Sequence, residues 1–305
     1  MKSKIILISG PTASGKSSFA IKIARKINGE IINADSMQVY KEFRILTARP
    51  SIKEKKNIKH HLYGFISVKK NFSTGSWLKL AIKKIKEIEK KNKIPILVGG
   101  TGLYFKALTE GFVKIPNIPQ KIRREVRFLQ NKLGQKKFYQ KLIKIDPICK
   151  IKINNNDKQR SIRAYEIKKT TKISIFEWYK KTKSSFEKNK FKMIYIDFPK
   201  DKLINKINFR VDQMFKRSVV KEVEKFLKLK VQKANSSYKI IGIHEISDYL
   251  WKNSNLLETK DRIAIKTRQY AKRQRTWARG QMNNWEKIDP LNLNTELKKI
   301  ENNFS

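Results

Sequence analysis

Short apolar runs rich in β-branched residues alternate with longer stretches in which apolar residues recur at helical spacing. Residues 4–9 (Lys-Ile-Ile-Leu-Ile-Ser), 30–34 and 94–98 are runs of the first kind, which is typical of buried parallel strands. Apolar residues recur every three or four positions over 19–27 and again over 77–91, which predicts helices with one apolar face. Strand, helix and strand in this order predict a doubly wound α/β core.

The pattern changes after residue 115. Residues 116–190 carry helical stretches, proline-containing loops and no strong strand signal, which predicts a helical insertion domain. Residues 191–198 alternate apolar and polar positions and end at Pro199, so they are expected to return to the sheet. The stretch 201–280 is mostly helical and strongly basic. We therefore expect an α/β core of residues 1–115 and 191–285 that includes basic C-terminal helices, an insertion domain of residues 116–190, and a peripheral tail of residues 286–305.

Composition narrows the class of protein. The chain has 305 residues, of which 10% are aromatic, enough to argue against disorder. No apolar run is long enough to span a bilayer, and the N-terminal residues lack the apolar region of a signal peptide. A single cysteine, Cys149, excludes a disulfide framework and a Cys-based zinc site, and it is expected to be a small core residue. We expect a soluble, cytoplasmic, monomeric protein without membrane contact.

Charge indicates a polyanionic partner. There are 71 Lys and Arg against 26 Asp and Glu, a net charge of +45. The chain is also rich in Lys, Ile and Asn, so many lysines are expected to be solvated surface. Arginine indicates a binding surface better than lysine does, because it is scarce in this chain. Its clustering between 262 and 279 favours nucleic acid over a merely basic surface. The clustered arginines are Arg262, Arg268, Arg273, Arg275 and Arg279.

The first predicted strand leads into a P-loop. The sequence Gly10-Pro11-Thr12-Ala13-Ser14-Gly15-Lys16-Ser17 matches G-x-x-x-x-G-K-[ST] and stands between a predicted strand and a predicted helix. Its glycines let several N–H groups point inward at a helix N-terminus, Lys16 supplies an ammonium group, and the Ser17 hydroxyl can bind Mg²⁺. The motif predicts a cradle for a diphosphate.

A P-loop alone does not identify a nucleotide hydrolase. Hydrolases usually hold Mg²⁺ with an aspartate on a second strand, whereas the strand at 94–98 ends in Gly99-Gly100. Asp35 instead follows the strand at 30–34, where ligands of α/β sheets bind. Its carboxylate could bind a metal or accept a proton from a substrate, or it could serve only as a turn or N-cap residue.

Several further motifs carry a resemblance. They include Asp35-Ser-Met-Gln-Val-Tyr-Lys, Thr47-Ala-Arg-Pro50, Gly99-Gly-Thr-Gly-Leu-Tyr104, Asn156-Asp-Lys-Gln-Arg160-Ser-Ile-Arg163-Ala, Arg210-Val-Asp-Gln-Met214 and Thr267-Arg-Gln-Tyr-Ala-Lys-Arg-Gln-Arg-Thr-Trp277. Together with the P-loop, in this order and over about residues 5–280, they resemble the bacterial tRNA dimethylallyltransferase (tRNA isopentenyltransferase) family. One departure is Ile243, where the family often has an aromatic residue; this weakens any RNA contact at that position.

The resemblance implies a reaction and roles for residues. The dimethylallyl group of dimethylallyl diphosphate would pass to N6 of the adenine 3′ of the anticodon. The loop from Gly10 to Ser17 would hold the diphosphate, with Ser17 toward Mg²⁺, and Asp35 would accept the N6 proton. Arg210 would join Lys16 in stabilising the departing diphosphate. The implied contacts to the tRNA anticodon stem-loop are Asp35, Ser36, Met37, Gln38, Thr101, Arg123, Gln159, Arg160, Ser161, Ile162 and Arg163.

The remaining basic residues leave alternatives open. On the segment 267–277, Arg268, Arg273 and Arg275 are expected to face RNA phosphates while Tyr270 and Trp277 face the core. Without the family, Arg210 reads as a surface arginine on a basic helix. The adjacent histidines at 60 and 61 are expected to be polar loop residues, since no third metal ligand is evident.

Two other functions compete with the transferase. A P-loop kinase of a small metabolite predicts ATP binding, but it leaves the arginine cluster at 262–279 and the missing acid after the strand at 94–98 unexplained. A non-enzymatic RNA-binding protein explains the charge but not the P-loop. Only the transferase requires both an allylic diphosphate and a tRNA anticodon arm.

Overall fold

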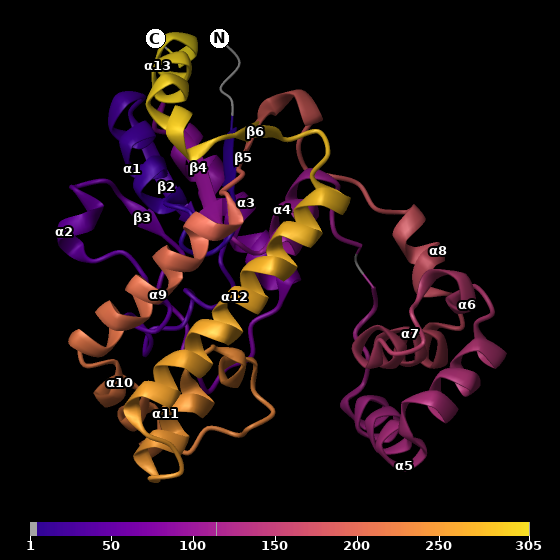
Figure 1. Cartoon of the computed structure of the whole chain (residues 1–305). Helices are drawn as coiled ribbons and strands as arrows, with labels where there is room; N and C mark the ends of the chain where they lie inside the picture. Colours follow the sequence, from indigo (N-terminus) through magenta and orange to yellow (C-terminus); the bar gives the residue numbers. More distant parts are fainter. Residues whose placement is uncertain (1–4, 114, 305) are drawn as a thin grey trace. The chain divides into compact units, whose positions relative to one another are not determined.

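A computed structural model of the chain describes residues 5–113 and 115–304, which form two compact units (Figure 1). One unit combines residues 1–109 with 185–305, and residues 110–184 form the other. The helical unit therefore begins at Glu110 rather than 116 and ends at Ser184 rather than 190. Lys4, the first residue of the first predicted strand, lies outside the described residues.

A six-stranded sheet in which every neighbouring pair is parallel forms the centre of the first unit, as the strand pattern predicts. Its spatial order is β3-β2-β4-β1-β5-β6. The central strand β1 thus lies between β4 and β5, and β2 lies one strand further out. The strands are β1 (Ile5–Ser9), β2 (Gly29–Asn33), β3 (His60–His61), β4 (Ile94–Gly99), β5 (Phe191–Ile196) and β6 (Glu286–Ile288).

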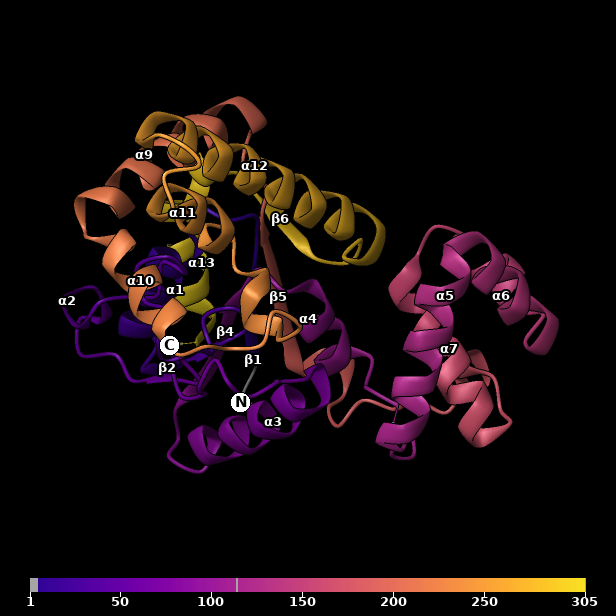
Figure 2. The same ribbon diagram turned by 90° about the horizontal axis from the view of Figure 1, so that it is seen from below.

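Both faces of this sheet are covered by helices (Figures 1 and 2), which is why its central strands β1 and β4 are almost entirely apolar. Alternate residues of β1 point to opposite cores: Ile6 and Ile8 join one cluster, and Ile5 and Leu7 join the other. The helices are α1 (Lys16–Lys26), α2 (Ile52–Lys55), α3 (Thr74–Glu89), α4 (Gly102–Thr109), α9 (Lys200–Lys216), α10 (Val219–Lys228), α11 (Ile243–Leu250), α12 (Leu256–Gln281) and α13 (Leu293–Phe304). Three 3₁₀ turns cover Lys188–Lys190, Ser236–Lys239 and Pro290–Asn292.

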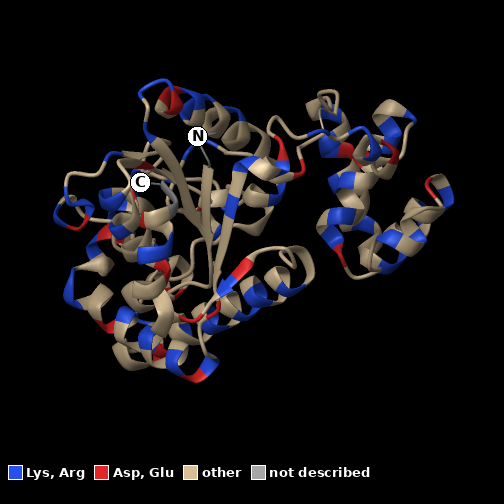
Figure 3. Cartoon of the chain, turned by 90° about the horizontal axis from the view of Figure 1, so that it is seen from above, with Lys and Arg blue, Asp and Glu red and all other residues tan. Residues whose placement is uncertain are grey.

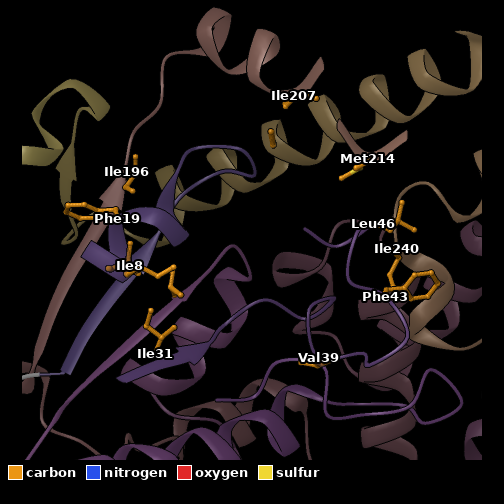
Figure 4. Packing of buried hydrophobic residues seen from close by; sticks show 14 of the residues in the cluster. Ile8, Phe19, Ile31, Val39, Phe43, Leu46, Ile196, Ile207, Met214 and Ile240 are labelled. Atoms are coloured by element: carbon orange, nitrogen blue, oxygen red, sulfur yellow. The ribbon is translucent and has the colours of Figure 1, made fainter. Parts of the chain in front are cut away.

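The larger core joins α1 and α9 to the loop that follows β2. Figure 4 shows Phe19 of α1 beside Ile8 and Ile196 of the sheet. Phe43, in the loop, packs against Phe226 of α10 in a tilted arrangement, with ring centroids 4.9 Å apart. The second core joins α3 and α4 to the C-terminal part of α12. Within the described residues no helix combines the length and apolar character needed to cross a bilayer.

The second unit is helical. It consists of α5 (Gln120–Ile145), α6 (Cys149–Lys152), α7 (Lys158–Thr171) and α8 (Ile175–Lys180) around a small core of its own. The long helix α5 is broken at Gly134, whose φ of 71° and ψ of 168° are not helical. Cys149 is fully buried in this core, which confirms the prediction for the cysteine.

Two expectations need correction. His60 and His61 are not loop residues: they form the edge strand β3, and His61 Nε2 lies 2.6 Å from Glu30 Oε2. The segment 286–305 is not peripheral either. Residues Glu286–Ile288 pair with β5, and Ile300 of α13 is buried in the larger core. The sequence pattern gives no signal for β6, because this strand is only three residues long and its flanks are polar.

Candidate active site

The P-loop has a conformation that requires its glycine-rich sequence. It connects β1 to α1, and Gly15 caps α1 with a φ of 84°. A Cβ at Gly15 would meet no atom within 4 Å, so the position faces open space. Ala13 also has a positive φ of 64°. The chain therefore curls so that its N–H groups surround an open concavity at the N-terminus of α1.

Two cations stand beside this loop. Lys16 Nζ donates to Pro11 O at 3.1 Å, and Arg210 Nη1 of α9 donates to Thr12 Oγ1 at 2.8 Å. Burial lowers the pKa of Lys16 to about 8, against the opposing effect of the Asp35 carboxylate and with a smaller contribution from Arg210. Burial also lowers the pKa of Arg210, and Asp35 opposes this effect. Arg210 is thus a partly buried residue that contacts the P-loop and not the surface arginine of the alternative interpretation.

Polar atoms around the loop lack partners. Ser14 Oγ and Arg210 Nε are buried and make no hydrogen bond to any described residue. Leaving such groups unpaired is costly, so they indicate a polar ligand that satisfies them. The oxygens of a diphosphate have the charge and hydrogen-bonding capacity that the loop, Lys16 and Arg210 require.

Asp35 is held rigidly at the end of β2. Its N–H donates to Asn33 Oδ1 at 2.9 Å, and Asn33 Nδ2 donates to Leu62 O at 3.0 Å. Asp35 Oδ1 accepts a hydrogen bond from Met37 N at 2.9 Å. The hydrogen bond from Met37 N is the turn interaction that the sequence left open for Asp35. It occupies one carboxylate oxygen, and Oδ2 has no hydrogen-bond partner among the residues described.

Charge and aromatic rings surround this carboxylate. Burial raises the pKa values of the Tyr63, Tyr104 and Tyr270 hydroxyls, and the negative charge of Asp35 raises each of them further. Tyr104 stacks on Trp77, with ring centroids 4.2 Å apart. Because Asp35 also acts on Lys16 and Arg210, it is close both to the diphosphate cradle and to these neutral tyrosines. Such a site can hold an aromatic ring, such as a nucleobase, next to an anion.

Gln274 of α12 joins two loops of the site, and the sequence gives no signal for this role. Its Oε1 accepts from Thr12 N at 2.8 Å, and its Nε2 donates to Gly100 O at 2.9 Å. A Cβ at Gly100 would lie 2.1 Å from Gln274 Nε2. The glycine after β4 therefore lets α12 approach the sheet closely enough for its glutamine to hold the P-loop.

A large cavity adjoins the cradle. Its volume is about 1010 Å³, and Ser17 and Arg210 both line it. Further lining arginines are Arg25, Arg44, Arg49 and Arg217. A cavity of this charge suits an anionic ligand that reaches the P-loop from the side of α1 and α9.

The loop bordering that cavity is fixed by one carboxylate. Glu222 of α10 accepts three consecutive backbone N–H groups, from Arg44 at 2.6 Å, Ile45 at 2.9 Å and Leu46 at 2.8 Å. Gln38 Nε2 donates to Thr47 O at 2.9 Å, which ties the same loop to the segment after Asp35. The sequence does not predict the Glu222 contact, because nothing in the pattern around a glutamate on a basic helix indicates its partner.

The predicted contacts that follow Asp35 are grouped with it. Ser36 N donates to Thr101 Oγ1 at 2.9 Å, and Thr101 Oγ1 donates to Ser36 Oγ at 3.3 Å. Ser36, Met37, Gln38 and Thr101 are all partly exposed. Ile243, by contrast, is fully buried, consistent with the doubt about an RNA contact at this position.

The other predicted RNA contacts lie on two helical segments. In the second unit, Arg123 lies in the first turn of α5. Gln159, Arg160, Ile162 and Arg163 lie on α7, with Gln159 and Arg160 exposed. Ser161 differs: it is fully buried, and its hydroxyl donates to Asp157 O at 2.7 Å. The predicted tRNA contact of Ser161 is therefore wrong, because this side chain offers no accessible surface.

On α12, Arg273 is exposed, and Arg268 and Arg275 are partly exposed. The side of the helix that packs on the sheet buries Ala271, Gln274 and Ala278, and Arg268 and Arg275 lie at the border of this buried side. The arginines thus remain available to an anion while the helix packs on the sheet. Figure 3 shows Lys and Arg along the helices of both units, so charge alone does not mark a single binding face.

The IPP transferase family model matches residues 38–281 of this chain. The chain belongs to the IPP transferase family. A relative from Pelagibacter ubique named tRNA dimethylallyltransferase is 60% identical over 299 residues, covering 98% of this chain and 96% of the relative. Another with this name, from Rickettsia massiliae, is 44% identical, covering 91% and 77%.

Solved structures of IPP transferases have the same fold. The full-length tRNA isopentenylpyrophosphate transferase from Bacillus halodurans matches with a TM-score of 0.71 and 34% identity, over 99% of this chain and 95% of that one. A eukaryotic dimethylallyltransferase solved acting on tRNA matches with a TM-score of 0.82 and 28% identity, over 94% of this chain and 74% of that one. The α/β fold predicted from the sequence is therefore that of the family.

Proposed function

We propose that this chain is a tRNA dimethylallyltransferase that moves the dimethylallyl group of dimethylallyl diphosphate to N6 of the adenine 3′ of the anticodon. The observation that carries the proposal is that Lys16 and Arg210 contact the P-loop, at Pro11 O and Thr12 Oγ1, while the nearby Asp35 carboxylate is fixed by Met37 N. The full-length relatives named tRNA dimethylallyltransferase support it.

The donor is activated by positive charge around its diphosphate. As the bond between the allylic carbon and the diphosphate oxygen breaks, negative charge accumulates on the leaving group. Lys16, Arg210 and the backbone N–H groups at the N-terminus of α1 are positioned to stabilise that charge. Because the cations are fixed before the reaction, little reorganisation is required when the bond breaks.

Mg²⁺ fits the cradle as a partner of the diphosphate. Among the described residues no three His, Cys, Asp or Glu side chains are grouped to hold a metal ion. Magnesium is commonly bound by one or two protein oxygens together with phosphate oxygens and water, and Ser17 supplies such an oxygen beside the cavity. When bound, the ion would neutralise charge on the diphosphate.

The acceptor is activated by Asp35. An aromatic amine is a weak nucleophile, so a base that removes the N6 proton as the new N–C bond forms lowers the barrier. Oδ2 of Asp35 is available for that proton while Oδ1 remains bonded to Met37 N. The products are the N6-dimethylallyladenine, diphosphate and the proton on Asp35.

The tRNA would be held by both units. Ser36, Met37, Gln38 and Thr101 lie next to Asp35 and would contact the adenine, which must leave the stack of the anticodon loop. The arginines of α12 would bind phosphates, as would Arg123, Arg160 and Arg163 of the second unit, with Gln159 and Ile162 beside them. We expect the enzyme to act as a monomer, which light scattering of the purified chain would test.

Transfer of label tests the function. Dimethylallyl diphosphate labelled in its allyl group is incubated with Mg²⁺, the enzyme and an unmodified anticodon stem-loop, alongside a stem-loop in which the target adenine is replaced by guanine. Label should enter only the first RNA, and diphosphate should appear in equal amount. Absence of transfer by the folded enzyme with several tRNAs, together with phosphate transfer from ATP to a small metabolite, would support a kinase instead.

A further inference from the structure

A second, smaller cavity lies at the carboxyl end of β5, on the same edge of the sheet as the P-loop. Its volume is about 90 Å³, enough for more than one water-sized group. Polar lining comes from Tyr195 of β5, Asp197 just beyond it, Arg275 and Arg279 of α12, and Lys287 of β6. We call this cavity the Tyr195 cup.

The Tyr195 cup is lined by a hydroxyl that has no hydrogen-bond partner among the described residues. Tyr195, which carries this hydroxyl, is 5% exposed. Burial, helped by the Asp197 carboxylate and opposed by Arg275 and Arg279, raises the pKa of this phenol to about 12. The hydroxyl therefore stays protonated and can donate. A buried donor without an acceptor indicates a missing partner.

Three cations line the Tyr195 cup together with this hydroxyl. Arg275, Arg279 and Lys287 form no ion pair with any described residue. The only acid lining the cup is Asp197, so three positive charges face one negative charge. Arg275 and Arg279 lie one helical turn apart on α12, which places both guanidinium groups on the same side of the helix. The single Asp197 carboxylate cannot neutralise all three cations. The remaining positive charge attracts an oxyanion.

The position of the Tyr195 cup connects it to the catalytic centre. Arg275 directly follows Gln274, whose side chain contacts the P-loop. An RNA that delivers its adenine to Asp35 would therefore have this part of α12 close to its backbone. β6, which supplies Lys287, belongs to the segment that the sequence pattern predicted to be peripheral.

We infer that the Tyr195 cup binds a phosphate oxyanion, with Tyr195, Arg279 and Lys287 donating beside Arg275. The source of the oxyanion is a backbone phosphate of the tRNA, which rests on the proposed function, or free inorganic phosphate. Both present the same tetrahedral set of acceptor oxygens, so binding must be measured with each.

Two substitutions test the cup. Tyr195→Phe removes only the hydroxyl and keeps the packing of the ring, and Arg279→Gln removes one charge. The matched control is Lys79→Gln, which removes an exposed charge of α3 away from the cup. Equilibrium binding of the unmodified anticodon stem-loop is measured at several salt concentrations, with circular dichroism as the check of folding. Inorganic phosphate is titrated calorimetrically into Lys16→Ala protein, in which the P-loop is weakened, with and without each substitution.

If the oxyanion belongs to RNA, Arg279→Gln weakens stem-loop binding about tenfold and reduces the salt slope by about one, and Tyr195→Phe weakens binding about threefold. If it is free phosphate, the calorimetric signal of the Lys16→Ala protein is lost in both variants while RNA binding is unchanged. If Tyr195→Phe and Arg279→Gln bind the stem-loop and phosphate as Lys79→Gln does, the inference is wrong. A wild-type protein that binds no stem-loop contradicts the proposed function instead, and the phosphate titration still tests the cup.

Discussion

The backbone N–H of Thr12 donates a 2.8 Å hydrogen bond to the side-chain Oε1 of Gln274. The two residues are 262 positions apart in the chain. Since Gln274 lies among the basic residues of α12 and Thr12 belongs to the diphosphate loop, the bond joins the predicted RNA-binding helix to the predicted donor site. Gln274 is a positioning residue, because it fixes the loop without reaching the reacting atoms.

Gln274→Ala should weaken donor binding more than it slows chemistry. The substitution leaves Thr12 N and Gly100 O without partners in a buried setting, which costs about 1–3 kcal/mol. We expect the KM for dimethylallyl diphosphate to rise about tenfold with a smaller fall in kcat. Steady-state kinetics measure the split, with Gln269→Ala on the exposed side of α12 as control. An unchanged KM in a folded variant would remove Gln274 from this role.

Gly100→Ala should reproduce the effect of Gln274→Ala. The new Cβ would lie 2.1 Å from Gln274 Nε2, so the glutamine side chain must move and release Thr12. Because both substitutions break the same pair of bonds, their effects on the donor KM should not add in the double variant. Additive effects would show that Gly100 acts through another contact.

Arg210→Lys tests whether geometry or charge matters at the cradle. Lysine keeps the positive charge but loses the planar fork that bonds Thr12 Oγ1 at 2.8 Å. We expect kcat to fall about 10- to 100-fold in Arg210→Lys and about 100- to 1000-fold in Arg210→Gln. Lys216→Gln, an exposed position at the end of α9, is the control. Full activity in Arg210→Lys would reduce the role of Arg210 to charge alone.

The pKa of Lys16 predicts a loss of donor binding in alkaline solution. Its pKa is about 8, so above this pH the free enzyme loses the ammonium that faces the diphosphate. The value of kcat/KM for the donor should therefore fall above about pH 8. Between this pKa and the ordinary value of 10.5, the unfolded chain binds the proton more tightly, so Lys16 favours the folded state more as pH rises. Thermal unfolding in the same buffers separates lost binding from lost fold; a flat kcat/KM profile to pH 10 would contradict the assignment.

The central part of the fold could be predicted because its signals are local. β1, the P-loop and α1 are consecutive in the chain, and the apolar run, the glycines and the helical spacing each appear within a few residues. Asp35 could be placed near the P-loop because the carboxyl ends of parallel strands share one edge of the sheet. The motifs resembling a family then assigned its role.

The parts that could not be predicted depend on partners distant in sequence. β3 is two residues long, too short for a pattern, and it is defined only by its pairing with β2, where His61 also contacts Glu30. Gln274 and Glu222 look like ordinary polar residues of basic helices, and only the fold brings them to Thr12 and to the loop at 44–46. Burial of Ser161 likewise depends on how α7 packs.

The most direct test of the account is single-turnover transfer of the dimethylallyl group to the anticodon stem-loop by wild type and Asp35→Asn. Asparagine keeps the shape of the side chain and an oxygen for Met37 N, but it cannot take the N6 proton. The account predicts a rate lower by about 10²- to 10⁴-fold, with the affinities for the stem-loop and the diphosphate changed by only about threefold. Transfer by Asp35→Asn at the wild-type rate would contradict it.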